Sequence, residues 1–528
     1  MTTVSREIGR VLREAGVRYA MGHPGGEVVE LIEGLRAEGI EFILTHHEAT
    51  AAFMADAIGY YTRIPGVCVA TLGPGATNLI TGIAHAYLDR APVIALTGQL
   101  PASRYDMVTH QKIDLGAVFA PITKWHARVQ PNNVRAVTSR ALRVATRRRA
   151  GPVHLEVASD VADQESSDRG DYVTHRLTEA NGVVEGAAAA AALIASKRPL
   201  LLAGMDALSD GVAESLRALA EGWSIPVIVT PKAKGVLPED HPLFLGTIEM
   251  LGTDRLFALI EQCDLVMMIG MDPVEFDRDW IAAAKVVHIG PLPNDDLYFA
   301  SEIELVGSVA QTLGALMEAA GTPSARWDDD EVGNFRDEMR RRLDPQVDGL
   351  SAQALLRELR SVLRADAIVT CDVGQNKSVT GQCWPVYQPR SFFMSNGLSS
   401  MGYGLPAAMA LKLLEPDRQV ACIIGDGGFT MYLGEIETAV RRGLAVVVVV
   451  LVDGALTQIR MNQARRGLFP TGTEFGVIDY VGLARALGAD GFEVTNIKEA
   501  RDAVQFASGN ARRPTVIAAN INPRCYEI

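Results

Sequence analysis

The chain has 528 residues, of which 48% are hydrophobic and 21% are charged. This length exceeds what one hydrophobic core usually serves, so we expect three domains of ordinary size. The formal net charge of −13 at pH 7 disfavours nucleic acid or an anionic membrane surface as a partner.

Residues 1–7 lack the apolar core of a secretion signal, and the longest apolar run, 444–452, is too short to span a bilayer. We therefore expect a cytoplasmic protein that does not bind a membrane. The six cysteines form no Cys-x-x-Cys pair, which indicates reduced thiols and neither a zinc site nor a disulfide framework. They are Cys68, Cys263, Cys371, Cys383, Cys422 and Cys525.

Short β-branched runs alternate with longer helical patterns in three stretches of the chain, which is typical of parallel α/β layers. The predicted strands include 42–44, 67–70 and 92–96, then 200–202, 226–229, 265–269 and 286–289, then 367–370, 420–424, 445–452 and 515–518. The predicted fold class is α/β, with three doubly wound parallel-sheet domains at 1–165, 185–322 and 350–528. Polar segments at 163–171 and 322–331 are interpreted as linkers.

Two carboxylates in the third stretch follow predicted strands directly. Asp426 lies in the turn 425–428, Gly-Asp-Gly-Gly, and Asp453 follows the next apolar run. Because the carboxyl ends of parallel strands meet at one edge of a sheet, these hard oxygen ligands can converge on a small divalent cation while glycine amides approach a phosphate. The pattern predicts a metal–diphosphate site.

Three places in the first stretch also follow predicted strands, where ligands of open parallel sheets bind. They are the glycine loop 22–26, which includes Pro24 and Gly25, the segment 46–48, which ends in Glu48, and the glycine turn 73–78. Each has an ordinary structural interpretation when taken alone. Glu48 can be a helix-start residue and the glycines can form turns, just as Met401 can fill a core and Asp453 can start a turn.

Together, however, these segments occur in the order seen in thiamine diphosphate (ThDP) enzymes. The matching segments are 48–55, 73–78, 401–406 and the Gly-Asp-Gly turn with Asp453. The chain resembles the acetolactate synthase branch of that family over nearly its whole length. It is most similar to the catabolic, flavin-independent acetolactate synthases, which have stretches like 110–111, 123–125 and 272–275.

The resemblance implies the ThDP-enzyme architecture, with ThDP and Mg²⁺ as cofactors. Asp426, Asp453 and the carbonyl of Ala455 would hold Mg²⁺ against the diphosphate. The other implied cofactor-binding residues surround these ligands or lie in the first domain. They are Pro24, Gly25, Gly374, Gln375, Asn376, Ser399, Gly425, Gly427 and Gly428.

Three further roles follow from the same resemblance. Met401 would lie beneath the cofactor and force its two rings into the bent, reactive form, while Ser399 would bring backbone groups to the aminopyrimidine. Glu48 would reach that ring from the neighbouring subunit and promote removal of the thiazolium proton. Gln111 and His110 resemble residues that face the substrate, although each could equally be an ordinary loop residue.

The implied function is decarboxylation of a 2-oxo acid, with pyruvate as the expected substrate, and transfer of the two-carbon fragment to a second carbonyl. The implied assembly is a homodimer or homotetramer with active sites between subunits. The alternatives are a simple 2-oxo acid decarboxylase or other ThDP-dependent lyase, and a ThDP-fold binding or scaffold protein. A dinucleotide-binding protein is disfavoured because no Gly-x-Gly-x-x-Gly turn joins a strand to a helix.

Departures from the anabolic relatives concern the substrate pocket and the flavin. Those relatives carry methionine where Gln458 stands and tryptophan where Asn462 stands. They also carry an arginine-containing, flavin-binding stretch where this chain has 271–273, Met-Asp-Pro. We therefore expect a more polar pocket and no FAD.

Overall fold

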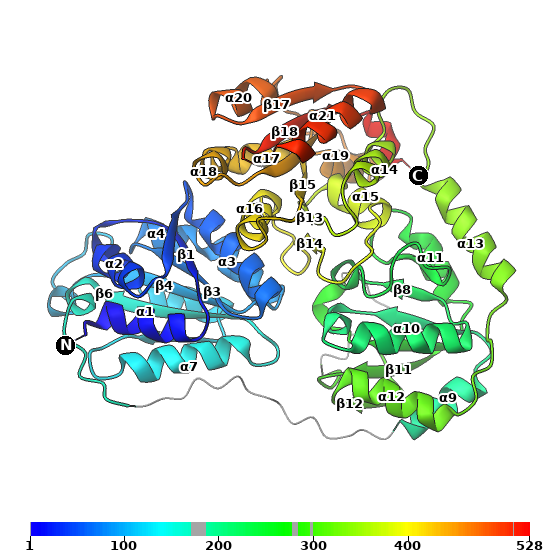
Figure 1. The fold of residues 1–528 in the computed structure, drawn as a ribbon, viewed down its shortest axis with the longest axis horizontal. Coiled ribbons are helices and arrows are strands. Elements are labelled where there is room, and N and C mark those ends of the chain that lie inside the picture. The colour runs from blue at the N-terminus through cyan, green and yellow to red at the C-terminus, as the bar shows by residue number, and fades with distance from the viewer. Residues whose placement is uncertain (1, 171–185, 277–282, 296–298, 511, 528) are drawn as a thin grey trace.

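The structure is a computed structural model, and it describes residues 2–170, 186–276, 283–295, 299–510 and 512–527. Three six-stranded sheets follow one another along the chain, and every strand pair in them is parallel (Figure 1). This confirms the predicted class of three parallel α/β domains. The predicted limits at residues 1, 185 and 528, and the linker residue 171, lie outside the described residues.

The first domain has the strand order β2-β1-β3-β4-β6-β5. Its strands are β1 (Tyr19–His23), β2 (Glu41–Leu44), β3 (Gly66–Ala70), β4 (Val93–Gln99), β5 (Trp125–Arg128) and β6 (Pro152–Ala158). Its helices are α1 (Val4–Glu14), α2 (Val29–Ala37), α3 (Glu48–Thr62), α4 (Pro74–Asn78), α5 (Ile80–Leu88), α6 (Leu115–Phe119), α7 (Val134–Thr146) and α8 (Ser159–Ala162).

The central domain has the order β12-β11-β10-β7-β8-β9. Its strands are β7 (Pro199–Ala203), β8 (Val227–Val229), β9 (Phe244–Thr247), β10 (Leu265–Ile269), β11 (Lys285–Gly290) and β12 (Ile303–Val306). Its helices are α9 (Ala187–Ala195), α10 (Val212–Trp223), α11 (Thr253–Ile260), α12 (Val309–Ala320) and α13 (Asp329–Arg342).

The third domain has the order β14-β13-β15-β16-β18-β17. Its strands are β13 (Ile368–Cys371), β14 (Phe392–Met394), β15 (Val420–Gly425), β16 (Val446–Val452), β17 (Asp490–Val494) and β18 (Thr515–Asn520). Its helices are α14 (Ala352–Val362), α15 (Gln375–Cys383), α16 (Gly404–Leu414), α17 (Asp426–Tyr432), α18 (Glu435–Arg441), α19 (Thr457–Arg465), α20 (Tyr480–Ala486) and α21 (Ile497–Gly509).

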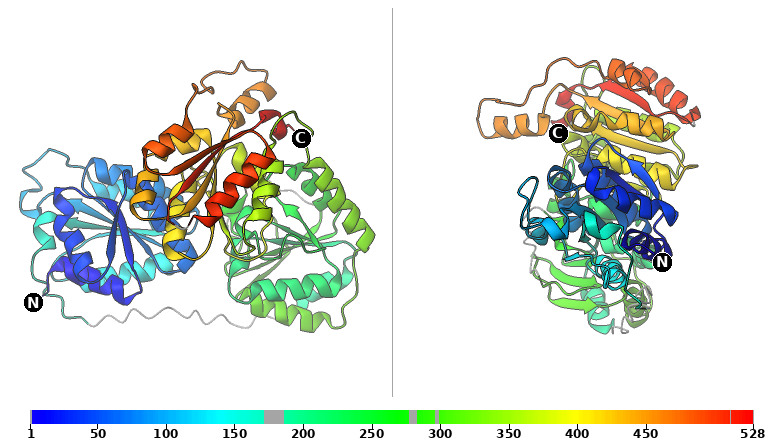
Figure 2. Two further views of the ribbon diagram at one scale, coloured as in Figure 1. Left: turned by 45° about the horizontal axis from the view of Figure 1, so that its top comes forward. Right: turned by 90° about the vertical axis from the view of Figure 1, so that its left-hand side faces the viewer.

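The central strands are continuous apolar runs because helices cover both faces of each sheet. In β16, for example, six valines and a leucine occupy all seven positions, and only the last residue is not fully buried. The third domain lies across the first and the central domains (Figures 1 and 2). One hydrophobic cluster includes Phe53 of the first domain with Tyr403 and Phe429 of the third, so these two domains share a core.

The acidic run 328–331, interpreted above as part of a linker, is instead the start of a helix. Helix α13 begins at Asp329, and the side chain of Asp328 caps it by accepting the backbone N–H of Asp330. Carboxylates are favourable in a first helical turn because they face the positive end of the helix dipole.

All six cysteines are free, as expected. No helix of the described ranges is both long and apolar enough to cross a membrane.

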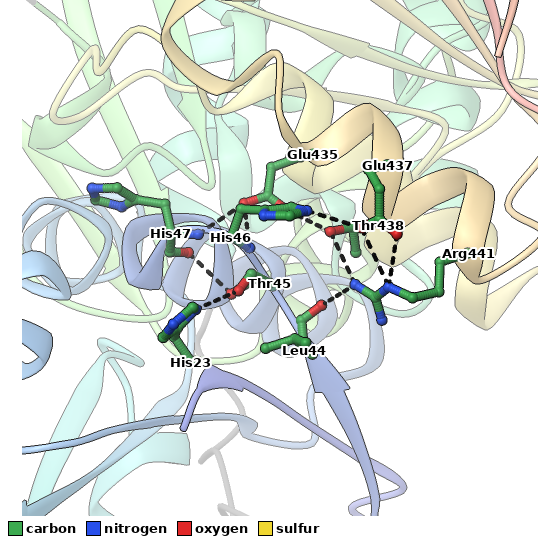
Figure 3. A network of polar contacts seen from close by, with 9 residues as sticks. All are labelled: His23, Leu44, Thr45, His46, His47, Glu435, Glu437, Thr438 and Arg441. Carbon is green, nitrogen blue, oxygen red and sulfur yellow. Dashed lines mark hydrogen bonds and ion pairs between the residues drawn. The ribbon is translucent and has the colours of Figure 1, made fainter. Parts of the chain in front are cut away.

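A polar network joins the end of β2 to helix α18 and so connects the first domain to the third (Figure 3). The buried carboxylate of Glu435 accepts hydrogen bonds of 3.0 Å from the backbone N–H groups of both His46 and His47. His47 is the N-cap of helix α3. The network therefore fixes where this helix begins, and with it the position of Glu48.

We expect Glu435→Ala to lower the free energy of unfolding by about 1–3 kcal/mol, because two backbone N–H groups would lose a charged acceptor. Glu437→Ala is the matched control: this neighbouring carboxylate is 37% exposed and pairs with His46, so its removal should cost less than about 1 kcal/mol. Urea denaturation followed by circular dichroism measures both. Equal effects of the two substitutions would contradict the role given to Glu435.

Candidate active site

A cavity of about 140 Å³ opens at the carboxyl ends of β13, β15 and β16 in the third domain. The structure brings most of the sequence-predicted cofactor and metal residues together around it. Those that line it are Gly374, Gln375, Asn376, Met401, Gly425, Asp426, Gly427, Gly428, Asp453 and Ala455.

Asp426 lies at the junction of β15 and α17, and its side chain forms hydrogen bonds that connect the end of β15 with the end of β16. One carboxylate oxygen accepts the backbone N–H of Gly427 at 2.8 Å. The other accepts the N–H groups of Asp453 at 3.2 Å and Gly454 at 2.7 Å. These bonds hold the turn after β16 against the start of α17, so the carboxylate is oriented before any ligand binds.

The second carboxylate, Asp453, lies beside the first in a largely buried position. Burial, together with the negative charge of Asp426, raises the pKa of Asp453 to about 6. Burial also raises the pKa of Asp426, although its backbone N–H partners oppose the shift. Two desolvated carboxylates that repel each other form a site that a cation would stabilise.

The donor set at this place consists of oxygen atoms, which suits a hard divalent cation. Asp426, Asp453 and Ala455 all line the cavity. Within the part of the chain that the structure describes, no group of three or more His, Cys, Asp or Glu side chains could hold a metal ion. A third protein ligand would therefore not be one of these side chains, which agrees with the predicted role of the Ala455 carbonyl.

Four glycines, Gly374, Gly425, Gly427 and Gly428, contribute backbone without side chains to the cavity lining. A Cβ atom added at Gly427 would lie 3.1 Å from Leu456 and 3.3 Å from Met401, and one added at Gly428 would lie 2.6 Å from Asp372. Gly374 has a φ of +133°, a conformation that side-chain-bearing residues rarely adopt. The cavity thus depends on glycine, and the exposed amides fit a diphosphate.

Asp372, which the sequence analysis missed, holds the turn that carries Met401. It is fully buried after β13, and its two carboxylate oxygens accept the N–H of Gly402 at 2.8 and 2.9 Å. Burial raises its pKa to about 7. Its position directly after a predicted strand, as for Asp426 and Asp453, was the signal that could have identified it.

A larger cavity of about 530 Å³ adjoins the first and extends toward the central domain. Gly374, Gln375, Gln458 and Tyr526 line both cavities, whereas Ser399 lines only the larger one. Asn462 is among the lining residues of neither. Of the two polar departures from the anabolic relatives, only Gln458 therefore faces the site. Tyr526 was also missed, because nothing in the local sequence connects the C-terminus with this cavity.

Glu48 occupies the first position of helix α3 and is 8% exposed. One of its carboxylate oxygens accepts a hydrogen bond of 3.0 Å from the side-chain amide of Asn78. The other faces Gly75, where an added Cβ would lie 3.2 Å away. The glycine turn 73–78 and helix α3 thus orient this carboxylate.

The other predicted residues of the first domain surround the same turn. Thr71 packs between two glycines, since a Cβ at Gly25 would lie 2.6 Å from it and a Cβ at Gly75 would lie 2.8 Å from it. This contact places the loop that contains Pro24 and Gly25 beside the turn 73–78. Gln111 has a φ of 57°, and a Cβ added at Gly73 would lie 3.1 Å from the Cβ of Gln111. His110 is an exposed loop residue.

The predicted site residues therefore form two separate half-sites in one chain. Glu48, Pro24, Gly25 and Gln111 gather at the carboxyl edge of the first sheet, and none of them lines either cavity of the third domain. The sequence prediction is that Glu48 serves the cofactor of a neighbouring subunit. That prediction requires Glu48 to lie apart from the cavity of its own chain, as it does here.

Three family models match the chain in the order of its domains. The N-terminal TPP binding domain of thiamine pyrophosphate enzymes matches residues 2–118, the central domain matches 187–316, and the C-terminal TPP binding domain matches 372–519. Thiamine pyrophosphate is another name for ThDP. The matches show that ThDP is the cofactor of the group to which this chain is similar.

Curated relatives match the chain over nearly its whole length. A probable acetolactate synthase large subunit of Methanocaldococcus jannaschii is 32% identical over 94% of this chain and 88% of the relative. The acetolactate synthase of Bacillus subtilis is 30% identical over 96% and 91%, and the catabolic acetolactate synthase of Raoultella terrigena is 30% identical over 97% and 94%. The chain belongs to the acetolactate synthase family of thiamine diphosphate-dependent enzymes.

Proposed function

We propose that this chain is a ThDP- and Mg²⁺-dependent acetolactate synthase that decarboxylates pyruvate and joins the two-carbon fragment to a second 2-oxo acid. The observation that carries the proposal is the single cavity in which Asp426 and Asp453 face a glycine backbone beside Met401. Relatives named acetolactate synthase, aligned over nearly the whole chain, support the reaction. The cofactor, when bound, supplies an electron sink for loss of CO₂ from a 2-oxo acid.

In this proposal the third domain binds and shapes the cofactor. Asp426, Asp453 and the carbonyl of Ala455 hold Mg²⁺, which neutralises the diphosphate and relieves the repulsion between the two carboxylates. Backbone amides of Gly427 and Gly428, with the turn 374–376, bind the diphosphate oxygens. Met401 would contact the rings of the cofactor and favour their reactive arrangement, and its position is secured by the hydrogen bonds from the Gly402 N–H to Asp372.

The first domain of a neighbouring subunit provides the proton-transfer group. Glu48 holds and exchanges a proton with the aminopyrimidine, and Asn78 and the start of helix α3 keep its carboxylate in place. Gln111, packed on Gly73, and His110 are proposed to face the substrate from the same subunit. Pro24 and Gly25 approach the cofactor through the loop after β1.

An apolar strip beside the cofactor cavity supports a homodimer as the minimal unit. Phe475 is 37% exposed and would contact a Cβ at Gly427, so it reaches the cavity wall. The same part of the chain exposes four more large apolar side chains, which together with Phe475 are called the apolar strip. They are Ile459, Leu468, Phe469 and Val477, of which Phe469 is 86% exposed. A second copy that presents Glu48 to this cavity would cover the strip, and a homotetramer would repeat the contact.

Two further expectations belong to the same proposal. We propose domain limits at 1–165, 185–322 and 350–528, so that each sheet lies within one domain. We also propose that the enzyme works in the cytoplasm, where its six free cysteines would stay reduced.

Asp426→Asn and Asp453→Asn should each weaken ThDP binding in the presence of Mg²⁺ by at least about 100-fold, because the diphosphate would lose the cation that neutralises it. Asp479→Asn is the control, since this exposed carboxylate caps helix α20 and asparagine also caps helices well. Isothermal titration calorimetry measures the affinities. Wild-type affinity in both test variants would refute the assignment.

Glu48→Gln should bind ThDP with nearly unchanged affinity but slow hydrogen–deuterium exchange at the thiazolium C2 by roughly 10²–10⁴-fold, because an amide cannot share a proton as a carboxylic acid does. Glu30→Gln, an exposed position on helix α2, serves as the control. Quenched-flow exchange followed by NMR gives the rates. Exchange at the wild-type rate in Glu48→Gln would remove this residue from the proton transfer.

The polar side chain of Gln458 should favour pyruvate over 2-oxobutyrate as acceptor, and Gln458→Met should shift the ratio of kcat/KM values toward 2-oxobutyrate by about 1–3 kcal/mol. Asn462→Ala should have a smaller effect, because Asn462 lines neither cavity. Competition between the two acceptors in flavin-free buffer, with products quantified, measures the ratio. A native preference for 2-oxobutyrate, or activity only after FAD is added, would group this chain with the anabolic enzymes.

A further inference from the structure

Four charged side chains are buried together where the three domains meet, away from both cavities. The ring nitrogens of His85, on helix α5, lie 3.3 Å from a carboxylate oxygen of Asp56 and 3.2 Å from one of Asp89. Lys232, from a short 3₁₀ turn (Pro231–Ala233) of the central domain, donates to Asp89 at 2.8 Å. His85 has no exposed surface, and the other three are at most 8% exposed.

The geometry favours a positive charge on His85. Each ring nitrogen faces a carboxylate, and a neutral imidazole would present a lone pair to one of them. With His85 protonated, two negative and two positive charges balance, whereas a neutral ring would leave a net negative charge in a dry interior. The four facing atoms are close but make no well-aligned hydrogen bonds, so the attraction is ionic in character.

The electrostatic surroundings of His85 favour the same state. Burial by itself lowers its pKa, but the carboxylates of Asp89 and Asp56 outweigh burial and raise the pKa above the ordinary histidine value, against the opposing charge of Lys232. The buried carboxylate of Asp372 also lies within electrostatic range of the ring. The Tyr403 hydroxyl interacts with Asp56 and with Asp89. These groups lie on helix α3, at the end of helix α5, in the central domain and in the third domain.

The network contacts both ends of the segment 396–403, which carries Ser399 and Met401. At one end, Asp89 accepts the backbone N–H of Asn396 at 3.2 Å. At the other end, the ring of Tyr403 stacks on His85, with centroids 4.5 Å apart and planes 21° from parallel. Gly397 lies against Leu88 of helix α5, where an added Cβ would approach to 2.8 Å. The first domain thus holds this segment from three points.

We propose that protonated His85 is a positioning residue, which holds the segment 396–403 in the shape that lets Ser399 and Met401 meet the cofactor. The inference rests on the proposed cofactor roles of those two residues. His85 touches neither cavity and acts through Asp89 and Tyr403. Its contribution to ThDP affinity is complete at low pH and is lost as the pH rises through its raised pKa, because the neutral ring no longer balances the two carboxylates.

His85→Gln should weaken ThDP binding in the presence of Mg²⁺ by roughly 10- to 100-fold, the range typical for residues that orient the groups in direct contact with a bound ion. The double variant Asp56→Asn with His85→Gln should recover most of this loss, because it removes one charge of each sign. Both variants lack the imidazole ring, so the difference between them reports charge alone. Calorimetric titrations of the full-length protein measure the affinities.

His154→Gln is the matched control for the loss of a buried histidine. His154 is 1% exposed in the same domain and stacks on Phe119, with centroids 4.1 Å apart, but burial lowers its pKa to about 3 and the ring is neutral. This variant should lose stability yet keep the wild-type ThDP affinity and its pH dependence. An equal loss of affinity in His154→Gln and His85→Gln would overturn the proposal.

Two further results would overturn the proposal: wild-type affinity in His85→Gln, or no recovery in the double variant. If His85→Gln does not fold, the charge-balanced double variant is compared with the wild type between about pH 6 and 9. The affinity advantage of the wild type should then shrink as the pH rises, and a constant advantage would overturn the role of the charge. Failure of the wild type itself to bind ThDP would instead refute the proposed function.

Discussion

The convergence of three backbone N–H groups on the carboxylate of Asp426 is the interaction on which the cofactor cavity depends. It links the end of β16 to the start of α17, and it keeps two carboxylates close together where burial raises the pKa of both. In a protein selected only for stability, such a pair would be unfavourable. Under the proposed function, this repulsion is the physical property that would favour a cation and its diphosphate at the site.

Because the two half-sites are separate, contacts between domains position the residues of each half-site. Glu48 does not line the cavities of its own chain. Its position is instead set by Asn78 and by the Glu435 network at the start of helix α3 (Figure 3). The cavity, in turn, is shaped by Asp372 and by the buried charges around His85. In the proposed dimer, each half would already be held by its own hydrogen bonds and ion pairs, which would reduce the ordering needed when the cofactor and substrate bind.

Local sequence determined the fold class, the strand ends and most of the predicted residues that line the cavity of the third domain. Apolar runs such as 445–452 identify buried parallel strands, and parallel strands necessarily bring their carboxyl ends to one edge. Asp426, Asp453 and the glycines between them could therefore be assigned to one site without a structure. The acidic run 328–331 shows the limit of this reasoning, because the same charges are compatible with a solvated linker and with the first turn of a helix.

Only the tertiary structure decided which residues from distant segments share a surface. Tyr526 and Gln458 line the cavities while Asn462 does not, although Gln458 and Asn462 are one helical turn apart. Asp56, His85, Asp89 and Lys232 form one buried network although they belong to two domains. Sequence periodicity shows which face of an element is buried, but the partner of that face depends on how the sheets and domains dock.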